Sequence, residues 1–180
     1  MSIWPRIVRT ERTTISPWME IIARDVQSHP DAAPETYYAV GQPDYLVALA
    51  ITPDDRILLV RQFRAAVERF SLEFPAGMLD AGETPDRAIA RELLEETGYP
   101  AEKVELIGKN ATSGGRISNS TYSFFIRTGS RIADFTEEPG VSVSSVSVGE
   151  LRSLVLSGDF SEQCHLGVIA LAAAKRLVTF

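Results

Sequence analysis

The stretch from Gly77 to Tyr99 constrains the fold of this chain most, because it predicts one well-delimited amphipathic helix. Thr84 is a suitable N-cap, Pro85 suits the first helical position, and Gly98 suits the left-handed residue just beyond the end. We therefore expect a helix over residues 85–97. At about 100° per residue, its apolar side chains gather on one side and would bury against a sheet. These core residues are Ile89, Ala90, Leu93, Leu94 and Thr97.

The other side of this helix carries a cluster of carboxylates. Glu92, Glu95 and Glu96 share one face, with the small Ala88 one turn earlier on it. Like charges this close repel one another, and only Arg91, four residues before Glu95, is placed to offset them. Oxygen-rich anionic groups suit hard divalent cations such as Mg²⁺ or Mn²⁺. For a glutamate-rich helix taken alone, however, a solvated acidic face is the ordinary interpretation.

Patterns typical of strands stand on both sides of the helix. The order is strands, one central helix, more strands and then two terminal helices, which indicates an α/β sandwich with a mixed sheet. Five prolines break the first 44 residues into short pieces, so we expect residues 1–44 to form a small β-element and residues 45–180 the main domain. The expected strands are 18–26, 36–40, 45–51, 56–63, 69–74, 104–108, 121–127 and 141–148, and the expected terminal helices are 150–157 and 165–177.

Charge and composition exclude several classes of function. With 18 basic against 24 acidic residues the net charge is −6, which argues against general nucleic-acid binding. Cys164 is the only cysteine and His29 and His165 are the only histidines, so an internal disulfide is excluded and zinc or Ser-His-Asp chemistry is disfavoured. We assign Cys164 and His165 no chemistry. No apolar run approaches a membrane span of about 18 residues, and we expect a soluble, cytoplasmic protein with no membrane partner.

The residues around the acidic face match a known signature. Gly77 is followed after five residues by Glu83, and seven residues later the run from Arg91 to Gly98 reads RELLEETG. This spacing resembles the Nudix box of the Nudix hydrolases, with Tyr99 the only departure, where an aliphatic residue is usual. The resemblance implies a Nudix α/β/α sandwich and hydrolysis of a nucleoside diphosphate linked to another moiety. It also implies a structural role for Gly77 and a pairing of Glu83 with Arg91 that holds the loop against the helix.

The same resemblance implies a metal site on the acidic face. Glu92 and Glu96 would be ligands of Mg²⁺, with Mn²⁺ as an alternative. Glu95 would be a further ligand, or would support the site through water and assist the chemistry. A backbone carbonyl at Ala76 or Gly77 would add another ligand.

Flanking residues resemble those of the ADP-ribose and ADP-sugar pyrophosphatases within that family. The runs Leu59–Arg64 and Leu72–Gly77 carry this resemblance, and residues 112–121 resemble the substrate loop of the branch. It implies that Arg64 contacts the phosphates, a task that suits a bidentate guanidinium, although a strand-end arginine is as often a plain surface residue. Glu73 would either support the metal site or form a structural pair. The substrate-loop residues Ser113, Gly114 and Gly115 stand where the branch usually has Ser-Pro-Gly, and Gly-Gly is looser.

A second departure concerns the catalytic carboxylate. The branch commonly supplies a glutamate near residues 137–143, but Pro139 and Ser142 stand where we would expect it. Glu137 or Glu138 would replace it after a small shift. Otherwise the protein is slow or acts on a different substrate.

The resemblance as a whole implies a homodimer that cleaves an ADP-ribose-like nucleoside diphosphate sugar to a nucleoside monophosphate and a sugar phosphate. Alternative substrates are GDP-mannose, another nucleotide sugar or a dinucleotide. A non-catalytic Nudix-fold sensor of such ligands is the alternative from another class, against which the three intact glutamates argue. N-terminal aromatic residues of the branch can stack on a nucleobase across the dimer interface, but for Trp4 and Trp18 we favour plain packing.

Overall fold

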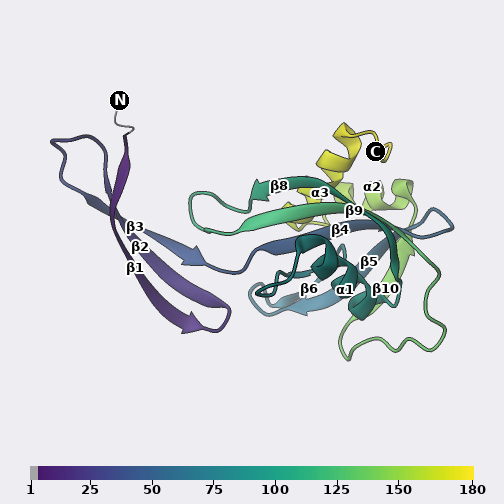
Figure 1. Cartoon of the computed structure of the whole chain (residues 1–180). Coiled ribbons are helices and arrows are strands. Elements are labelled where there is room, and N and C mark those ends of the chain that lie inside the picture. The colour runs from purple at the N-terminus through teal and green to yellow at the C-terminus, as the bar shows by residue number, and fades with distance from the viewer. Residues whose placement is uncertain (1–3) are drawn as a thin grey trace. The chain divides into compact units, whose positions relative to one another are not determined.

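The computed structural model describes residues 4–180, which form two compact units (Figure 1). The first unit comprises residues 4–43 together with residues 111–120. The second comprises residues 44–110 and 121–180 and contains the predicted acidic helix. The loop at residues 111–120 therefore belongs to the first unit, although it comes from the middle of the chain.

The first unit is a three-stranded antiparallel sheet in the order β1-β2-β3. Its strands are β1 (Arg6–Ser16), β2 (Met19–Gln27) and β3 (Glu35–Gly41). Strands near β2 and β3 were predicted, whereas β1 was not, because almost every residue of β1 is exposed and shows no buried periodicity. Within this unit, Ile22 is the one large apolar side chain that is fully buried.

The second unit is built on a seven-stranded sheet whose main path runs β10-β5-β4-β9-β8. Strand β4 pairs in parallel with β9 and in antiparallel with β5 and β7, which confirms the predicted mixed sheet. The short β7 was not predicted, and β6 extends the sheet through β5. The strands are β4 (Tyr45–Ile51), β5 (Ile57–Arg64), β6 (Arg69–Glu73), β7 (Ala76–Met78), β8 (Ala101–Ala111), β9 (Ser120–Thr128) and β10 (Ser142–Val146).

Helices cover both faces of this sheet (Figure 1). Helix α1 (Pro85–Thr97) packs on one face through a cluster that includes Leu46, Ala48 and Ala50 of β4. Helices α2 (Val148–Ser157) and α3 (Gln163–Ala174) belong to the cluster on the other face, with the alternate residues of β4. Each fully buried aliphatic side chain contributes roughly 1.5–3 kcal/mol. The predicted α/β/α sandwich is confirmed. Among residues 4–180, none of the helices has the length and apolar character that a membrane span requires.

Helix α1 has the predicted bounds but is rotated relative to the expected core side. Ile89, Leu93 and Thr97 are buried as expected, and Gly98 ends the helix with a φ of 75°. Ala88, which we placed on the carboxylate side, is fully buried, while Leu94 is 36% exposed. The buried arc therefore extends over the positions between Ala88 and Ile89 on the helix surface, where Glu92 and Glu96 lie. The fold turns these two carboxylates inward rather than toward open water.

Candidate active site

Glu96 is anchored against the strand that precedes the helix. One of its carboxylate oxygens, Oε2, accepts a hydrogen bond of 3.0 Å from the backbone N–H of Ala76, at the start of β7. Burial raises the pKa of Glu96 to about 8, and the negative charge of Glu92 adds to this, while the Ala76 hydrogen bond and Arg64 partly offset it. The Glu96 carboxylate is therefore poorly solvated, which disfavours its charged form.

Glu92 lies against Gly77, and the packing there depends on the absence of a side chain. A Cβ atom at position 77 would come within 2.2 Å of the Glu92 carboxyl carbon. Glycine at position 77 thus allows the Glu92 side chain to contact the backbone of β7 directly. Burial raises the pKa of Glu92 above its ordinary value, although Arg91 partly offsets this.

Arg91 forms ion pairs with several acidic side chains of this region. It donates to both carboxylate oxygens of Glu83, at 3.3 and 3.0 Å, which ties the loop before the helix to α1. It also donates to Glu92 and Glu95, each at 2.9 Å. The Glu95 side chain is 55% exposed and is turned toward Arg91. Glu95 is therefore the most accessible of the three clustered glutamates.

The fit of a divalent cation rests on Glu92 and Glu96. Among the described residues 4–180, no three acidic, histidine or cysteine side chains are already grouped around one point as metal ligands. Glu92 and Glu96, however, are one helical turn apart, half-buried, and each has a raised pKa. Mg²⁺ is usually held by one or two carboxylates, with water and substrate phosphates completing its shell. Two carboxylates of this kind fit such a cation.

Arg64, the predicted phosphate ligand, is held by Glu73. Its Nε donates to Glu73 Oε1 at 2.7 Å and its Nη2 donates to Glu73 Oε2, so the pair is bidentate. Glu73 is 1% exposed, whereas the Arg64 side chain is 38% exposed. Burial acts to raise the pKa of Glu73, but Arg64 outweighs it and the pKa lies below its ordinary value. Of the two interpretations of Glu73, the structural pair is the one observed.

A buried histidine, to which the sequence analysis assigned no chemistry, lies behind this pair, and its contacts were not predicted. His165 of α3 is 1% exposed, and its Nδ1 accepts a hydrogen bond of 2.9 Å from the backbone N–H of Phe74. Its Nε2 lies 3.4 Å from the Tyr45 hydroxyl and 3.8 Å from Glu73 Oε2. Burial lowers the pKa of His165 to about 4, so the imidazole is neutral near pH 7 with its proton on Nε2. A lone histidine at a helix start gave no signal of this role.

The predicted substrate-loop residues lie in the first unit, in a turn attached to β3. The Ser113 carbonyl accepts from the backbone N–H groups of Arg116 and Ile117, both at 2.8 Å. A Cβ atom at Gly115 would meet nothing within 4 Å, and one at Gly114 would meet only Ala111 at 3.8 Å. Nothing in this packing requires glycine at either position.

The late acidic loop docks on the end of α1. The backbone N–H of Ile132 donates to the Gly98 carbonyl at 2.9 Å, and Arg131 donates to the Thr97 carbonyl at 3.0 Å. Arg131 also donates to Glu137 at 2.9 Å, so Glu137 is engaged in an ion pair, while Glu138 is exposed. A catalytic role for either glutamate stays a prediction.

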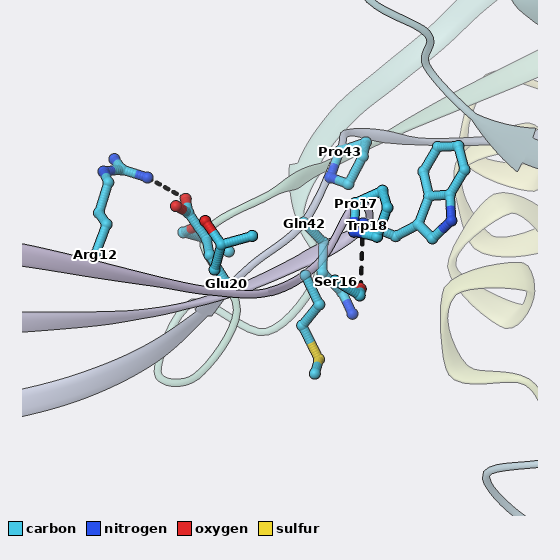
Figure 2. A pocket seen from close by; sticks show the side chains of 11 residues that line it. Arg12, Ser16, Pro17, Trp18, Glu20, Gln42 and Pro43 are labelled. Atoms are coloured by element: carbon cyan, nitrogen blue, oxygen red, sulfur yellow. Dashed lines mark hydrogen bonds and ion pairs between the residues drawn. The ribbon is translucent and has the colours of Figure 1, made fainter.

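The first unit contains a pocket of its own, with a volume of about 330 Å³ (Figure 2). Figure 2 shows Trp18 at one end of this pocket and the ion pair between Arg12 and Glu20 at the other. Trp18 is 57% exposed in the single chain, and the packing that we favoured for it stays a prediction. Pro43 and Gln42, which follow β3, line the space between them.

Comparison with known proteins identifies the family. Residues 42–160 match the NUDIX domain, so the chain belongs to the NUDIX family and the interpretation of the Gly77–Gly98 signature is confirmed. It is 36% identical over 121 residues to the ADP-ribose pyrophosphatase of Bacillus subtilis, a match that covers 66% of this chain and 65% of that protein.

Two further comparisons extend this picture. The chain is 34% identical over 110 residues to the methanol dehydrogenase activator of Bacillus methanolicus, covering 61% of this chain and 59% of the relative. It therefore spans less than two thirds of the length of either relative. A crystal structure of an ADP compounds hydrolase superimposes with a TM-score of 0.76 at 20% identity, covering 97% of this chain and 95% of that one. This last likeness establishes a shared fold.

Proposed function

We propose that this protein hydrolyses the diphosphate bond of ADP-ribose or a related nucleoside diphosphate sugar, giving a nucleoside monophosphate and a sugar phosphate. The observation that carries the proposal is the half-buried pair Glu92 and Glu96 within a Nudix box that departs from the signature only at Tyr99. The similarity to an ADP-ribose pyrophosphatase supports the substrate class.

The proposed cofactor is Mg²⁺, with Mn²⁺ as a substitute. Glu92 and Glu96 would hold it, and a backbone carbonyl at Ala76 is the further ligand that we propose. Glu95 would join after turning away from Arg91. When bound, the cation would neutralise the diphosphate and stabilise the charge that develops on its oxygens.

The reaction requires a positioned water and a group that accepts its proton. The water oxygen attacks one phosphorus in line, the bond from that phosphorus to the bridging oxygen breaks, and the bridging oxygen leaves with the other phosphate. Glu95, Glu137 and Glu138 are the carboxylates that we propose as candidates to take the proton. Arg64 would bind the phosphates through the part of its guanidinium that Glu73 does not use.

The substrate loop and the assembly are further parts of the proposal. Ser113, Gly114 and Gly115 would contact the terminal sugar. A homodimer would cover the apolar side chains that the three-stranded sheet leaves exposed, because that sheet has almost no core of its own. These side chains are Ile7, Val8, Ile15, Tyr37 and Tyr38. Light scattering on the purified full chain tests the dimer, and a monomer at micromolar concentration would contradict it.

The non-catalytic sensor remains the second candidate. It is favoured by Pro139 and Ser142, which stand at positions where a carboxylate is expected, and by the engagement of Glu137 with Arg131. A sensor would bind the ligand without turning it over.

A turnover screen distinguishes the hydrolase from the non-catalytic sensor. ADP-ribose, GDP-mannose, other nucleotide sugars and dinucleotides are incubated with Mg²⁺ or Mn²⁺, and the products are separated by chromatography. We expect AMP and ribose 5-phosphate from ADP-ribose, at least about a hundredfold less product with Glu96→Gln, and unchanged turnover with Glu102→Gln at an exposed site on β8. Cleavage of another compound instead would support the reaction but replace ADP-ribose as the proposed substrate. A raised melting temperature with ADP-ribose but no product would favour the sensor.

A further inference from the structure

The guanidinium of Arg64 is bound by Glu73, which lies three residues before Ala76, the residue whose backbone N–H binds Glu96. It forms the bidentate pair with Glu73, at the ends of β5 and β6. Its charge also reaches Glu96, whose pKa it lowers, while the negative charge of Glu73 raises that same pKa. No ion pair joins Arg64 to Glu96, and the Glu96 carboxylate instead accepts from the Ala76 backbone. Glu73 therefore holds Arg64 within electrostatic reach of Glu96, with no ion pair between Arg64 and Glu96.

The pairing with Glu73 also fixes which donors of Arg64 remain available. A guanidinium carries five N–H groups in a rigid plane, and the bidentate pair uses one on Nε and one on Nη2. The edge formed by Nη1 and the second N–H of Nη2 is left over. That edge is a second fork, suited to two oxygens of one phosphate.

Glu73 is well placed to keep this geometry. Its side chain is 1% exposed, and on its inner side lies the neutral ring of His165, with Nε2 at 3.8 Å. His165 is in turn fixed by the hydrogen bond from the Phe74 backbone. Because the carboxylate is surrounded by protein, it cannot turn out into water when a substrate arrives.

We propose that Glu73 is a positioning residue that holds Arg64 away from Glu96, leaving Glu96 for a divalent cation and the outer fork of Arg64 for a substrate phosphate. Besides Glu73, Glu96 is a carboxylate whose charge acts on Arg64, so without Glu73 we expect the guanidinium to turn to it. An Arg64–Glu96 pair would have to break before the cation could bind. This inference rests on the metal site of the proposed function.

The test is Mg²⁺ binding to the full chain, measured by isothermal titration calorimetry in the absence of substrate. We expect Glu73→Gln to weaken Mg²⁺ binding about tenfold or more. The released Arg64 guanidinium would then compete with Mg²⁺ for Glu96, and hydrogen bonds between charged groups are strong. Adding Arg64→Gln to this variant is expected to restore the affinity to within about threefold of the original, because the competing guanidinium is gone. Asp55→Asn is the matched control, since Asp55 pairs with Arg127 at 2.7 Å on an exposed turn. It is expected to leave Mg²⁺ affinity unchanged.

Two outcomes would overturn the inference. One is an unchanged Mg²⁺ affinity in Glu73→Gln, and the other is a loss that Arg64→Gln does not reverse, as a purely structural role of Glu73 would give. If Glu73→Gln does not fold, Glu73→Asp replaces it. That variant keeps the charge, shortens its reach, and should show a smaller loss that Arg64→Gln again reverses.

Failure of the proposed function is recognised separately. An unmodified chain that binds Mg²⁺ but hydrolyses no nucleotide sugar would refute the proposed reaction, while the Mg²⁺ comparison would still decide the role of Glu73.

Discussion

Gly77→Ala is expected to move Glu92 and damage the metal site while leaving the fold almost intact. The added Cβ would lie 2.2 Å from the Glu92 carboxyl carbon and 2.5 Å from its Cγ and Oε1. Carbon atoms that are not bonded approach to about 3.5 Å, so the Glu92 carboxyl carbon has to retreat by roughly 1.3 Å. Since a long, half-buried side chain can make this move, the free energy of unfolding should fall by only about 1 kcal/mol.

The effect on catalysis should be much larger than the effect on stability. A displacement of about 1 Å at a reacting centre costs about a hundredfold in rate. We therefore expect kcat/KM for ADP-ribose to fall about a hundredfold, which corresponds to ~2.7 kcal/mol. Urea unfolding without metal, Mg²⁺ titration and steady-state kinetics measure the three quantities. Gly167→Ala is the control, because a Cβ at this exposed helical site meets nothing within 4 Å.

Two results would refute this reasoning. If Gly77→Ala bound Mg²⁺ and turned over substrate as well as the unmodified chain, Glu92 would not need its position. If stability fell by about 3 kcal/mol or more, the close approach would concern the backbone rather than a movable carboxylate.

Three further predictions concern pH and packing. Burial raises the pKa of Glu96 to about 8. Because Mg²⁺ and the proton compete for this carboxylate, Mg²⁺ affinity should rise with pH up to pH 8, by up to about tenfold per pH unit. An Mg²⁺ affinity that calorimetry finds unchanged between pH 6 and 8 would contradict this. Burial lowers the pKa of His165 from 6.5 to about 4. As pH falls from 6.5 to 4, the histidine is therefore protonated in the unfolded chain but not in the folded one. The free energy of unfolding should fall over this range by up to ~1.4 kcal/mol per pH unit. In His165→Asn, which keeps an acceptor but cannot titrate, urea unfolding should show a shallower fall, and an equal slope would argue against a neutral buried histidine. Gly98→Ala should cost roughly 2–4 kcal/mol in urea unfolding, because φ is 75° and the Cβ would lie 2.3 Å from Phe135; a loss below about 1 kcal/mol would show that the loop at Phe135 moves aside freely.

Local signals account for what the sequence predicted well. The bounds of α1 follow from Pro85 at its start and Gly98 at its end, which act within a few residues. The burial of β4 on both faces follows from its continuous apolar run. Strand β1 was missed because its exposed residues carry no buried periodicity, and its pairing with β2 is what makes it a strand.

The parts of the site that sequence reasoning missed depend on contacts between distant segments. The rotation of α1 that buries Ala88 and exposes Leu94 is set by its packing on the sheet, which the helical period alone does not fix. The bidentate pair of Arg64 and Glu73 depends on the pairing of β5 with β6. The role of His165 arises only because α3 packs against the end of β6, 91 residues away in the chain.

The most direct measurement of the central claim is hydrolysis of ADP-ribose by the purified full chain with Mg²⁺, followed by identification and quantification of both products. The account predicts AMP and ribose 5-phosphate in equal amounts, activity that is abolished by chelating the metal, and a loss of at least about a hundredfold in Glu96→Gln. Unchanged hydrolysis in Glu96→Gln, or persistence of activity after the metal is removed, would contradict it.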